Sequence, residues 1–322
     1  MNTINLFPEI IAAEKRIKGK ILNTPLYPSN YLSSLSGGKV YLKLESEQFT
    51  GSFKARGALN KILATPEEAR KRGFITASTG NHAQGFARAL QIARATGTIF
   101  LPENASPAKV EALKNYPVTL KFFGNSSLET ELHAKSVAQK TGKIWVSPYN
   151  DPLIIGGQGT IGMEINCQSK EPIDYVLGCI GGGGMMAGVS TAMKSISPTS
   201  KIIGCLPEKS PEMYLSVQQG KVVFIDYEET LSDGSAGGLE EDSITFPICR
   251  KLIDEYSLVS EKEIAKSIRL VAEKHHKIIE GAAGVAVASF LKDIKKFEGK
   301  TVAIIICGAN ISMDKLKDCL EA

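Results

Sequence analysis

A lysine with unusual neighbours is the first candidate for chemistry in this sequence. Lys54 follows the aromatic Phe53 near the start of a predicted helix, and Gly57 leaves room for another group to approach closely. Ser52 is placed to cap this helix, which we expect to run from Phe53 to Ala64. Burial and the positive end of the helix dipole would lower the pKa of a lysine there. A neutral amine in that position could form a Schiff base with an aldehyde cofactor, whereas most lysines are simply solvated helix residues.

Four consecutive glycines form the second candidate. Gly181, Gly182, Gly183 and Gly184 follow a predicted strand and open a predicted helix. Several backbone N–H groups can converge there on one terminal phosphate at the N-terminus of the helix. The same segment also fits G-x-G-x-x-A with Ala187, which taken alone supports a nicotinamide dinucleotide. The segment therefore predicts a phosphate site and leaves the dinucleotide open.

A polar turn between a predicted strand and a predicted helix is the third candidate. It consists of Ser78, Thr79, Gly80, Asn81 and His82. Its N–H groups and hydroxyls could hold a carboxylate, and Asn81 could bond a ring hydroxyl. An ordinary capped turn explains the same residues, and His82 by itself is more typical of a structural histidine than of a base.

The end of a strongly apolar strand carries the fourth candidate, Cys307, in the run Cys307-Gly308-Ala309-Asn310. Ligands in open α/β sheets bind at the carboxyl ends of the strands. A buried packing thiol is the alternative.

The elements that must position these residues alternate between strand and helix. The first series of predicted strands is 74–77, 98–101, 118–123 and 144–146, with helices at 83–95, 108–115 and 128–140. After a turn-rich run at 147–152, a second series has strands at 175–180, 201–206 and 301–306, with helices at 185–195 and 211–219. This alternation predicts an α/β protein with two open, twisted, mostly parallel sheets covered by helices. Residues 221–243 are expected to form a long loop.

These series predict two domains. We expect residues 1–50 and 149–322 to form a large domain and residues 74–148 a small one, with 51–73 as a connecting segment that bears Lys54.

The composition excludes several classes of protein. The 322 residues include 43% hydrophobic and 22% charged residues, and the basic residues behind the net charge of +4 are scattered. Neither a nucleic-acid-binding stripe, a signal peptide nor a membrane span is expected. The six cysteines are widely spaced, which indicates buried thiols in a reducing cytoplasm.

Taken together, the motifs resemble the fold-type II pyridoxal-phosphate enzymes, which share the fold of the tryptophan synthase β-subunit. The resemblance is greatest to the branch of serine/threonine dehydratases (threonine ammonia-lyases) and serine racemases. It covers nearly the whole chain, with matches in the family's order at 52–58, 78–82, 156–160, 181–185, 280–284 and 307–310, and the loop 232–238 looks like the segment that flanks the cofactor in this family.

The resemblance implies a role for each matched residue. Lys54 would form the Schiff base with pyridoxal 5'-phosphate and act as the catalytic base, and the residues 78–82 would bind the substrate carboxylate. It also implies a homodimer that acts on a small amino acid. The cofactor-binding set would be Phe53, Lys54, Asn81, Gly181, Gly182, Gly183, Gly184, Met185, Glu280 and Cys307, with Phe53 against the pyridine ring, Asn81 on its 3-hydroxyl and Cys307 facing its nitrogen.

The implied reaction is the dehydration and deamination of L-threonine or L-serine to a 2-oxo acid and ammonia. A neutral thiol at the ring nitrogen makes the ring a weaker electron sink, which favours prompt loss of the β-hydroxyl. Thr79 stands where the racemases have a serine base, and Leu206 where they have a metal-binding glutamate, so no metal is expected. Racemisation of serine and dehydration of hydroxyaspartate, phenylserine or a hydroxyectoine-derived amino acid remain alternatives within the family. A nicotinamide-dependent dehydrogenase and a non-catalytic ligand-binding relative are alternatives from other classes.

Overall fold

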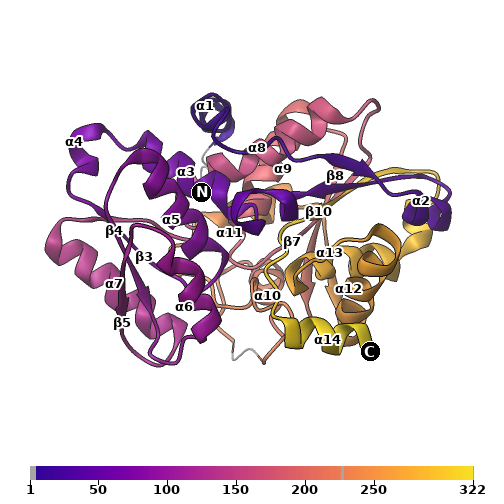
Figure 1. The fold of residues 1–322 in the computed structure, drawn as a ribbon. Coiled ribbons are helices and arrows are strands. Elements are labelled where there is room, and N and C mark those ends of the chain that lie inside the picture. The colour runs from indigo at the N-terminus through magenta and orange to yellow at the C-terminus, as the bar shows by residue number, and fades with distance from the viewer. Residues whose placement is uncertain (1–4, 226–227, 322) are drawn as a thin grey trace.

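The computed structural model describes residues 5–225 and 228–321 and contains two β-sheets flanked by helices (Figure 1). The larger sheet has six strands in the order β1-β2-β10-β7-β8-β9, and the smaller has four in the order β5-β4-β3-β6. All neighbouring strands are parallel except β1, which runs antiparallel to β2. The predicted fold class, with two mostly parallel sheets, is therefore confirmed.

The larger sheet is built around a strand that the sequence makes almost entirely apolar. The strand β10 lies between β2 and β7, and Ile304 is in register with Leu42 and Leu177. All five residues from Val302 to Ile306 are buried, because helices cover both faces of this part of the sheet. The strands of this sheet are β1 (Leu26–Pro28), β2 (Lys39–Leu44), β7 (Tyr175–Cys179), β8 (Lys201–Pro207), β9 (Glu255–Val259) and β10 (Thr301–Ile306).

The smaller sheet consists of four strands from one continuous stretch of the chain. They are β3 (Phe74–Ala77), β4 (Gly97–Leu101), β5 (Thr119–Phe122) and β6 (Ile144–Trp145). Each differs from its predicted bounds by at most one residue at either end, and the helices α5, α6 and α7 alternate with them as expected.

Fourteen α-helices are formed by the described residues. They are α1 (Phe7–Ile17), α2 (Asn30–Ser36), α3 (Lys54–Ala64), α4 (Glu67–Arg70), α5 (Asn81–Ala93), α6 (Pro107–Lys114), α7 (Ser127–Thr141), α8 (Pro152–Gln168), α9 (Gly184–Ile196), α10 (Glu212–Gln219), α11 (Thr245–Leu252), α12 (Glu261–His275), α13 (Gly281–Lys292) and α14 (Met313–Glu321). The described residues of the predicted loop 221–243 form neither helix nor strand.

Glycines allow the central helices to approach closely. A Cβ on Gly157 of α8 would lie 2.6 Å from Cα of Gly57 on α3, so the two backbones are in contact there. This confirms the close approach expected at Gly57. Other glycines of α8 allow different neighbours to approach, since a Cβ on Gly156 would lie 2.6 Å from the side chain of Glu9 on α1 and one on Gly162 would lie 2.9 Å from Ala192 on α9.

The start of α3 differs from the expectation. Ser52 does not cap the helix, which begins at Lys54 after Phe53, and no side-chain cap is present. Ser52 is instead extended and pairs with Gly308 in an isolated bridge, while the N–H of Phe53 donates to the carbonyl of Cys307. The position before the helix is taken by Phe53, and the buried Ser52 hydroxyl has no hydrogen-bond partner among the described residues. Through the bridge, the end of β10 is joined directly to the start of α3.

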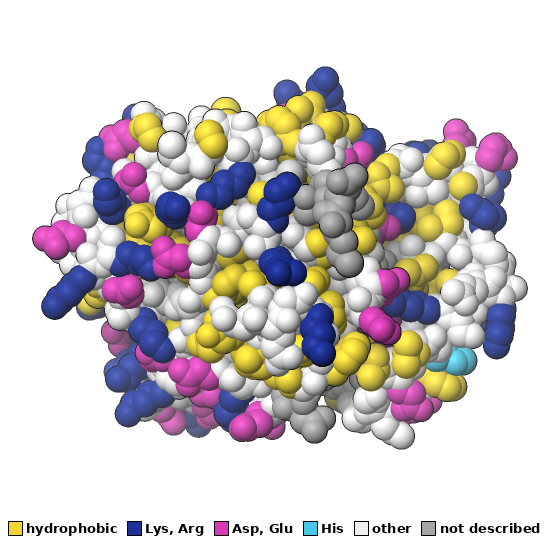
Figure 2. Space-filling model, turned by 180° about the vertical axis from the view of Figure 1, so that it is seen from behind, with side chains coloured by type: hydrophobic (Ala, Val, Ile, Leu, Met, Phe, Trp, Pro, Cys, Tyr) yellow, Lys and Arg dark blue, Asp and Glu magenta, His cyan; other side chains and the backbone are white. Residues whose placement is uncertain are grey.

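The surface and the cysteines confirm part of what the composition predicts. Figure 2 shows a face on which acidic, basic and apolar side chains are interspersed. None of the helices in the described part of the chain combines the length and the apolar character that a bilayer span requires. All six cysteines are free, but Cys167 is exposed, so the expectation of buried thiols is right only for the other five.

Candidate active site

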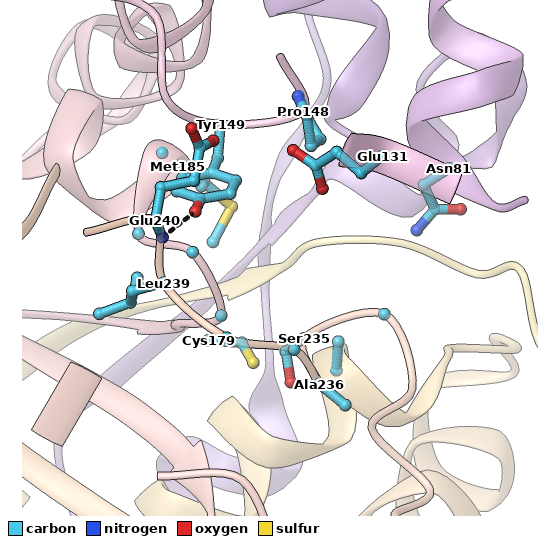
Figure 3. A pocket seen from close by; sticks show the side chains of 18 of the residues that line it. Asn81, Glu131, Pro148, Tyr149, Cys179, Met185, Ser235, Ala236, Leu239 and Glu240 are labelled. Carbon is cyan, nitrogen blue, oxygen red and sulfur yellow. Dashed lines mark hydrogen bonds between the residues drawn. The ribbon is translucent and has the colours of Figure 1, made fainter. Parts of the chain in front are cut away.

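One cavity of about 1030 Å³ brings together residues from helices and loops that flank the two sheets (Figure 3). Its lining comes from the start of α3, from α5 and α7, from the tetraglycine before α9, from the segment 234–242, and from the residues that follow β10. Three of the contributing segments directly follow the carboxyl ends of β3, β7 and β10, where open α/β sheets bind ligands.

Lys54 lies in this cavity and is partly shielded from solvent. Its Nζ donates a hydrogen bond of 2.8 Å to the carbonyl oxygen of Pro148 and lies 5.2 Å from the ring centroid of Phe53. Burial lowers the pKa of Lys54 to about 8, although the negative charges of Glu280 and Glu131 oppose the shift. The lowered pKa expected from the sequence is confirmed, and the cause is desolvation.

The tetraglycine segment lines the same cavity as Lys54. Gly183 has a φ of +84° and precedes α9, whose N-terminus has no side-chain cap. A Cβ on Gly181 would lie 2.5 Å from the carbonyl oxygen of Ser235, and one on Gly182 would lie 2.5 Å from the ring of Tyr149. Only glycine fits at these positions, and N–H groups at the start of α9 are left for an anion. Met185, in the first turn of α9, is buried and also lines the cavity.

Three predicted residues from distant parts of the chain, Asn81, Glu280 and Cys307, meet in the lining of this cavity. The Asn81 Nδ2 donates to both carboxylate oxygens of Glu280, at 3.0 and 2.9 Å, and the Cys307 thiol approaches Glu280 Oε1 at 3.7 Å. The N–H of Asn310 donates to the same carboxylate. Burial raises the pKa of Glu280 to about 7, and burial together with the charge of Glu280 raises that of Cys307.

The polar turn after β3 is only partly in the cavity. Asn81 lines it, whereas Ser78, Thr79, Gly80 and His82 are not among its described lining residues. His82 is buried, with Nε2 3.0 Å from Thr76 Oγ1, and burial lowers its pKa to about 3. His82 therefore packs beside the small sheet as a neutral ring, in agreement with the structural alternative. The carboxylate site at 78–82 stays a prediction.

Sequence reasoning missed four residues that shape the cavity. Tyr149 lies in the run 147–152, which we interpreted only as a turn, and its ring packs on the tetraglycine. Glu131 and Lys135 lie on α7, and Glu240 lies in the long loop. Helical spacing on α7 places Glu131 and Lys135 on one face, but nothing in the sequence indicates that this face meets the loop.

Comparison with known proteins settles the family. The model of the family described as "Pyridoxal-phosphate dependent enzyme" matches residues 17–308. The chain belongs to this family. Among curated proteins, an L-threonine ammonia-lyase of Thermotoga maritima is 41% identical over 308 residues, which is 96% of this chain and 76% of the relative.

Solved structures of the family have the same fold. A processed form of threonine deaminase isoform 2 from Solanum lycopersicum superposes with a TM-score of 0.93 at 33% identity, covering 100% of this chain and 94% of that one. Maize serine racemase superposes with a TM-score of 0.92 at 29% identity, covering 99% and 98%.

The residues of this cavity fit the family's cofactor. The uncapped start of α9 suits a terminal phosphate, and a lysine with a pKa of about 8 suits an aldehyde. The dinucleotide alternative for the glycine segment gives way to pyridoxal phosphate. In the described part of the chain, no group of three or more His, Cys, Asp or Glu side chains is arranged to hold a metal ion.

Proposed function

We propose that this protein converts L-threonine or L-serine into a 2-oxo acid and ammonia with pyridoxal phosphate. The observation that carries the proposal is that Lys54, with its lowered pKa, shares one cavity with the tetraglycine segment. The names of the similar proteins, L-threonine ammonia-lyase and threonine deaminase, support the same reaction.

The chain's own residues divide the work as follows. Lys54 binds the cofactor, and its neutral amine then takes the proton from the substrate α-carbon. The N–H groups of Gly181, Gly182, Gly183, Gly184 and Met185 hold the phosphate, and Phe53 packs against the ring. When bound, pyridoxal phosphate supplies the covalent link to the substrate amine and withdraws electrons from its α-carbon.

The group formed by Asn81, Glu280 and Cys307 would set the charge near the cofactor ring. Because burial keeps Cys307 a neutral thiol, it offers no negative charge to hold a proton on the ring nitrogen. Asn81 is held by Glu280, which orients its amide for the ring hydroxyl. Ser78, Thr79, Gly80, Asn81 and His82 would bind the substrate carboxylate through the start of α5.

Substituting Lys54 tests the proposal. Lys54→Ala should abolish the visible absorbance of the cofactor complex and the release of oxo acid from L-threonine and L-serine. Borohydride reduction of the wild type should fix the cofactor covalently to the peptide that contains Lys54, as mass spectrometry of the digested protein would show. An active Lys54→Ala protein, or a label on another peptide, would refute the proposal.

Serine racemisation is the second candidate, supported by the similarity to maize serine racemase. Chiral analysis of serine left after partial turnover separates the two reactions. A dehydratase leaves the remaining L-serine unchanged and accumulates pyruvate, whereas a racemase accumulates D-serine. Measuring oxo-acid release from hydroxyaspartate and phenylserine as well identifies the preferred β-hydroxy amino acid.

The organisation of the chain completes the proposal. We infer a large domain from residues 1–50 and 149–322, a small domain from 74–148, and a connecting segment at 51–73. The distribution of strands between the two sheets supports this division. A homodimer and a cytoplasmic location stay predictions. Free thiols, five of them buried, agree with a reducing compartment.

A further inference from the structure

A cluster of three charged side chains lies at one edge of the cavity. Glu131 and Lys135 are one turn apart on α7, and Lys135 Nζ lies 2.5 Å from Glu240 Oε2 and 3.5 Å from Glu131 Oε1. The side chains of Lys135 and Glu240 are only 26% and 21% exposed. Such an ion pair is better protected from solvent and salt than one at the open surface.

This cluster joins parts of the molecule that belong to different sheets. The helix α7 packs on β3, β4 and β6 of the small sheet. Glu240 lies in the connection between α10 and α11, and α11 packs against α9, the helix that follows β7 of the large sheet. The pair Lys135–Glu240 therefore connects a helix of the small sheet with the long loop at the edge of the cavity. Lys109 on α6 and Asp233 form a second, more exposed ion pair between a helix of the small sheet and the same loop.

Glu240 is also connected to the tetraglycine segment. Its backbone N–H donates a hydrogen bond of 2.8 Å to the Tyr149 hydroxyl (Figure 3). The Tyr149 ring lies directly over Gly182, where an added Cβ would be 2.5 Å from Cγ of the ring. A continuous chain of contacts thus runs from α7 through Glu240 and Tyr149 to the phosphate-binding segment.

The electrostatics favour a firm connection. Burial acts against the positive charge of Lys135, but the hydrogen bond and the charge of Glu240 outweigh it and raise the pKa of Lys135. Glu131 adds a second carboxylate to the same lysine. Lys135 also lies 5.7 Å from the ring centroid of Trp145, which restricts its position further.

We propose that Glu240 is a positioning residue, which uses its ion pair with Lys135 to hold the segment 237–242 against α7 and Tyr149 over the tetraglycine. This inference rests on the proposed function, because the segment so held closes the cavity in which the amino acid is bound. Neither residue is required to touch the reacting atoms.

Hydrogen exchange of the holoenzyme tests the connection without any assay of activity. The Glu240 amide should be protected in the wild type and should exchange faster in Lys135→Met, because the segment loses its anchor on α7. Glu240→Gln should show the same gain in exchange within residues 237–242. Lys140→Met is the matched control, since Lys140 is an exposed lysine on the same helix and does not line the cavity. Unchanged exchange in Lys135→Met would overturn the inference.

Kinetics supply the second measurement, as a double-mutant cycle. Each single substitution should raise KM for L-threonine about fivefold or more, with a smaller change in kcat, and the double variant should be no worse than either single one. If the fold-change in KM of the double variant equals the product of the two single fold-changes, the two residues act independently and the inference is overturned. A wild type without oxo-acid release would instead refute the proposed function, and the exchange data would still decide the role of Glu240.

Discussion

Arg56 and Glu45 are both completely buried and are joined by two hydrogen bonds of 2.7 Å each. The Arg56 guanidinium also donates to both carboxylate oxygens of Glu164, and Lys43 donates to Glu164 at 2.5 Å. Two positive and two negative side chains therefore neutralise one another in the interior. Arg56 lies two residues after Lys54, so this group fixes the first turn of α3, which has no side-chain cap.

Removing the guanidinium should unbalance this group. Arg56→Met is expected to lower the free energy of unfolding by about 3–5 kcal/mol, because it leaves the carboxylates of Glu45 and Glu164 with Lys43 as the one remaining positive charge in this group. Denaturant unfolding of both proteins measures the difference. Arg250→Met, which removes an exposed arginine, is the control and should change the free energy by less than about 1 kcal/mol. A similar decrease in the free energy of unfolding in both variants would show that Arg56 stabilises the fold no more than an exposed arginine does.

The pKa of Lys54 should be visible in cofactor attachment. Only the neutral amine reacts, so the rate at which pyridoxal phosphate attaches to the apoprotein should rise with pH with a midpoint near 8 instead of 10.5. Glu280→Gln should move the midpoint to lower pH, because the charge of Glu280 raises the pKa of Lys54. Stopped-flow absorbance measures the rate, and a midpoint that rises in Glu280→Gln would contradict the assignment.

The same shift affects stability. Because the pKa of Lys54 is lower in the folded than in the unfolded chain, the unfolded chain binds more protons between pH 8 and 10.5. The contribution of Lys54 to the free energy of unfolding of the apoprotein should therefore rise with pH across that interval.

The glycines of the phosphate segment offer a steric test. In Gly182→Ala, the new methyl group would lie 2.5 Å from the Tyr149 ring, so the ring or the segment must move. We expect weaker binding of pyridoxal phosphate, measured by equilibrium titration. Gly238→Ala is the comparison, because an added Cβ there has nothing within 4 Å. Equal affinity of both variants for pyridoxal phosphate would show that the close contact between Tyr149 and Gly182 does not matter for cofactor binding.

His82 should contribute to sensitivity to acid. Its pKa is about 3 in the folded chain against 6.5 for the free side chain, because it is buried. The unfolded chain therefore binds the extra proton between those pH values, and stability rises with pH by about 1.4 kcal/mol per pH unit from this residue. His82→Gln should reduce that slope by one proton. Urea unfolding of both proteins at several pH values between 3 and 6.5 measures how the free energy of unfolding depends on pH. Equal slopes for the wild type and His82→Gln would argue against a neutral buried His82.

Much of the fold could be predicted because local patterns determine it. Apolar runs such as 301–306 and the alternation of strands and helices from 74 to 146 indicate parallel sheets without any knowledge of contacts. The strands β1, β2 and β9 and the helices α1, α2, α4, α8, α11, α12, α13 and α14 were not predicted. The patterns of β1, β2, β9 and α8 are short, mixed or rich in glycine, and these elements are stabilised by neighbours that come from far along the chain.

For the site, the sequence by itself determined the chemical groups: an amine at Lys54, a phosphate-sized run of glycines, and a thiol at the end of a buried strand. Tertiary structure alone decided their relations. It joins Ser52 to Gly308 in place of a cap, puts the Asn81 amide on Glu280, and brings Glu240 from the long loop to Lys135. The physical reason is that side-chain chemistry and backbone propensity are local, whereas desolvation and ion pairing depend on which distant segments the packed sheets bring into contact.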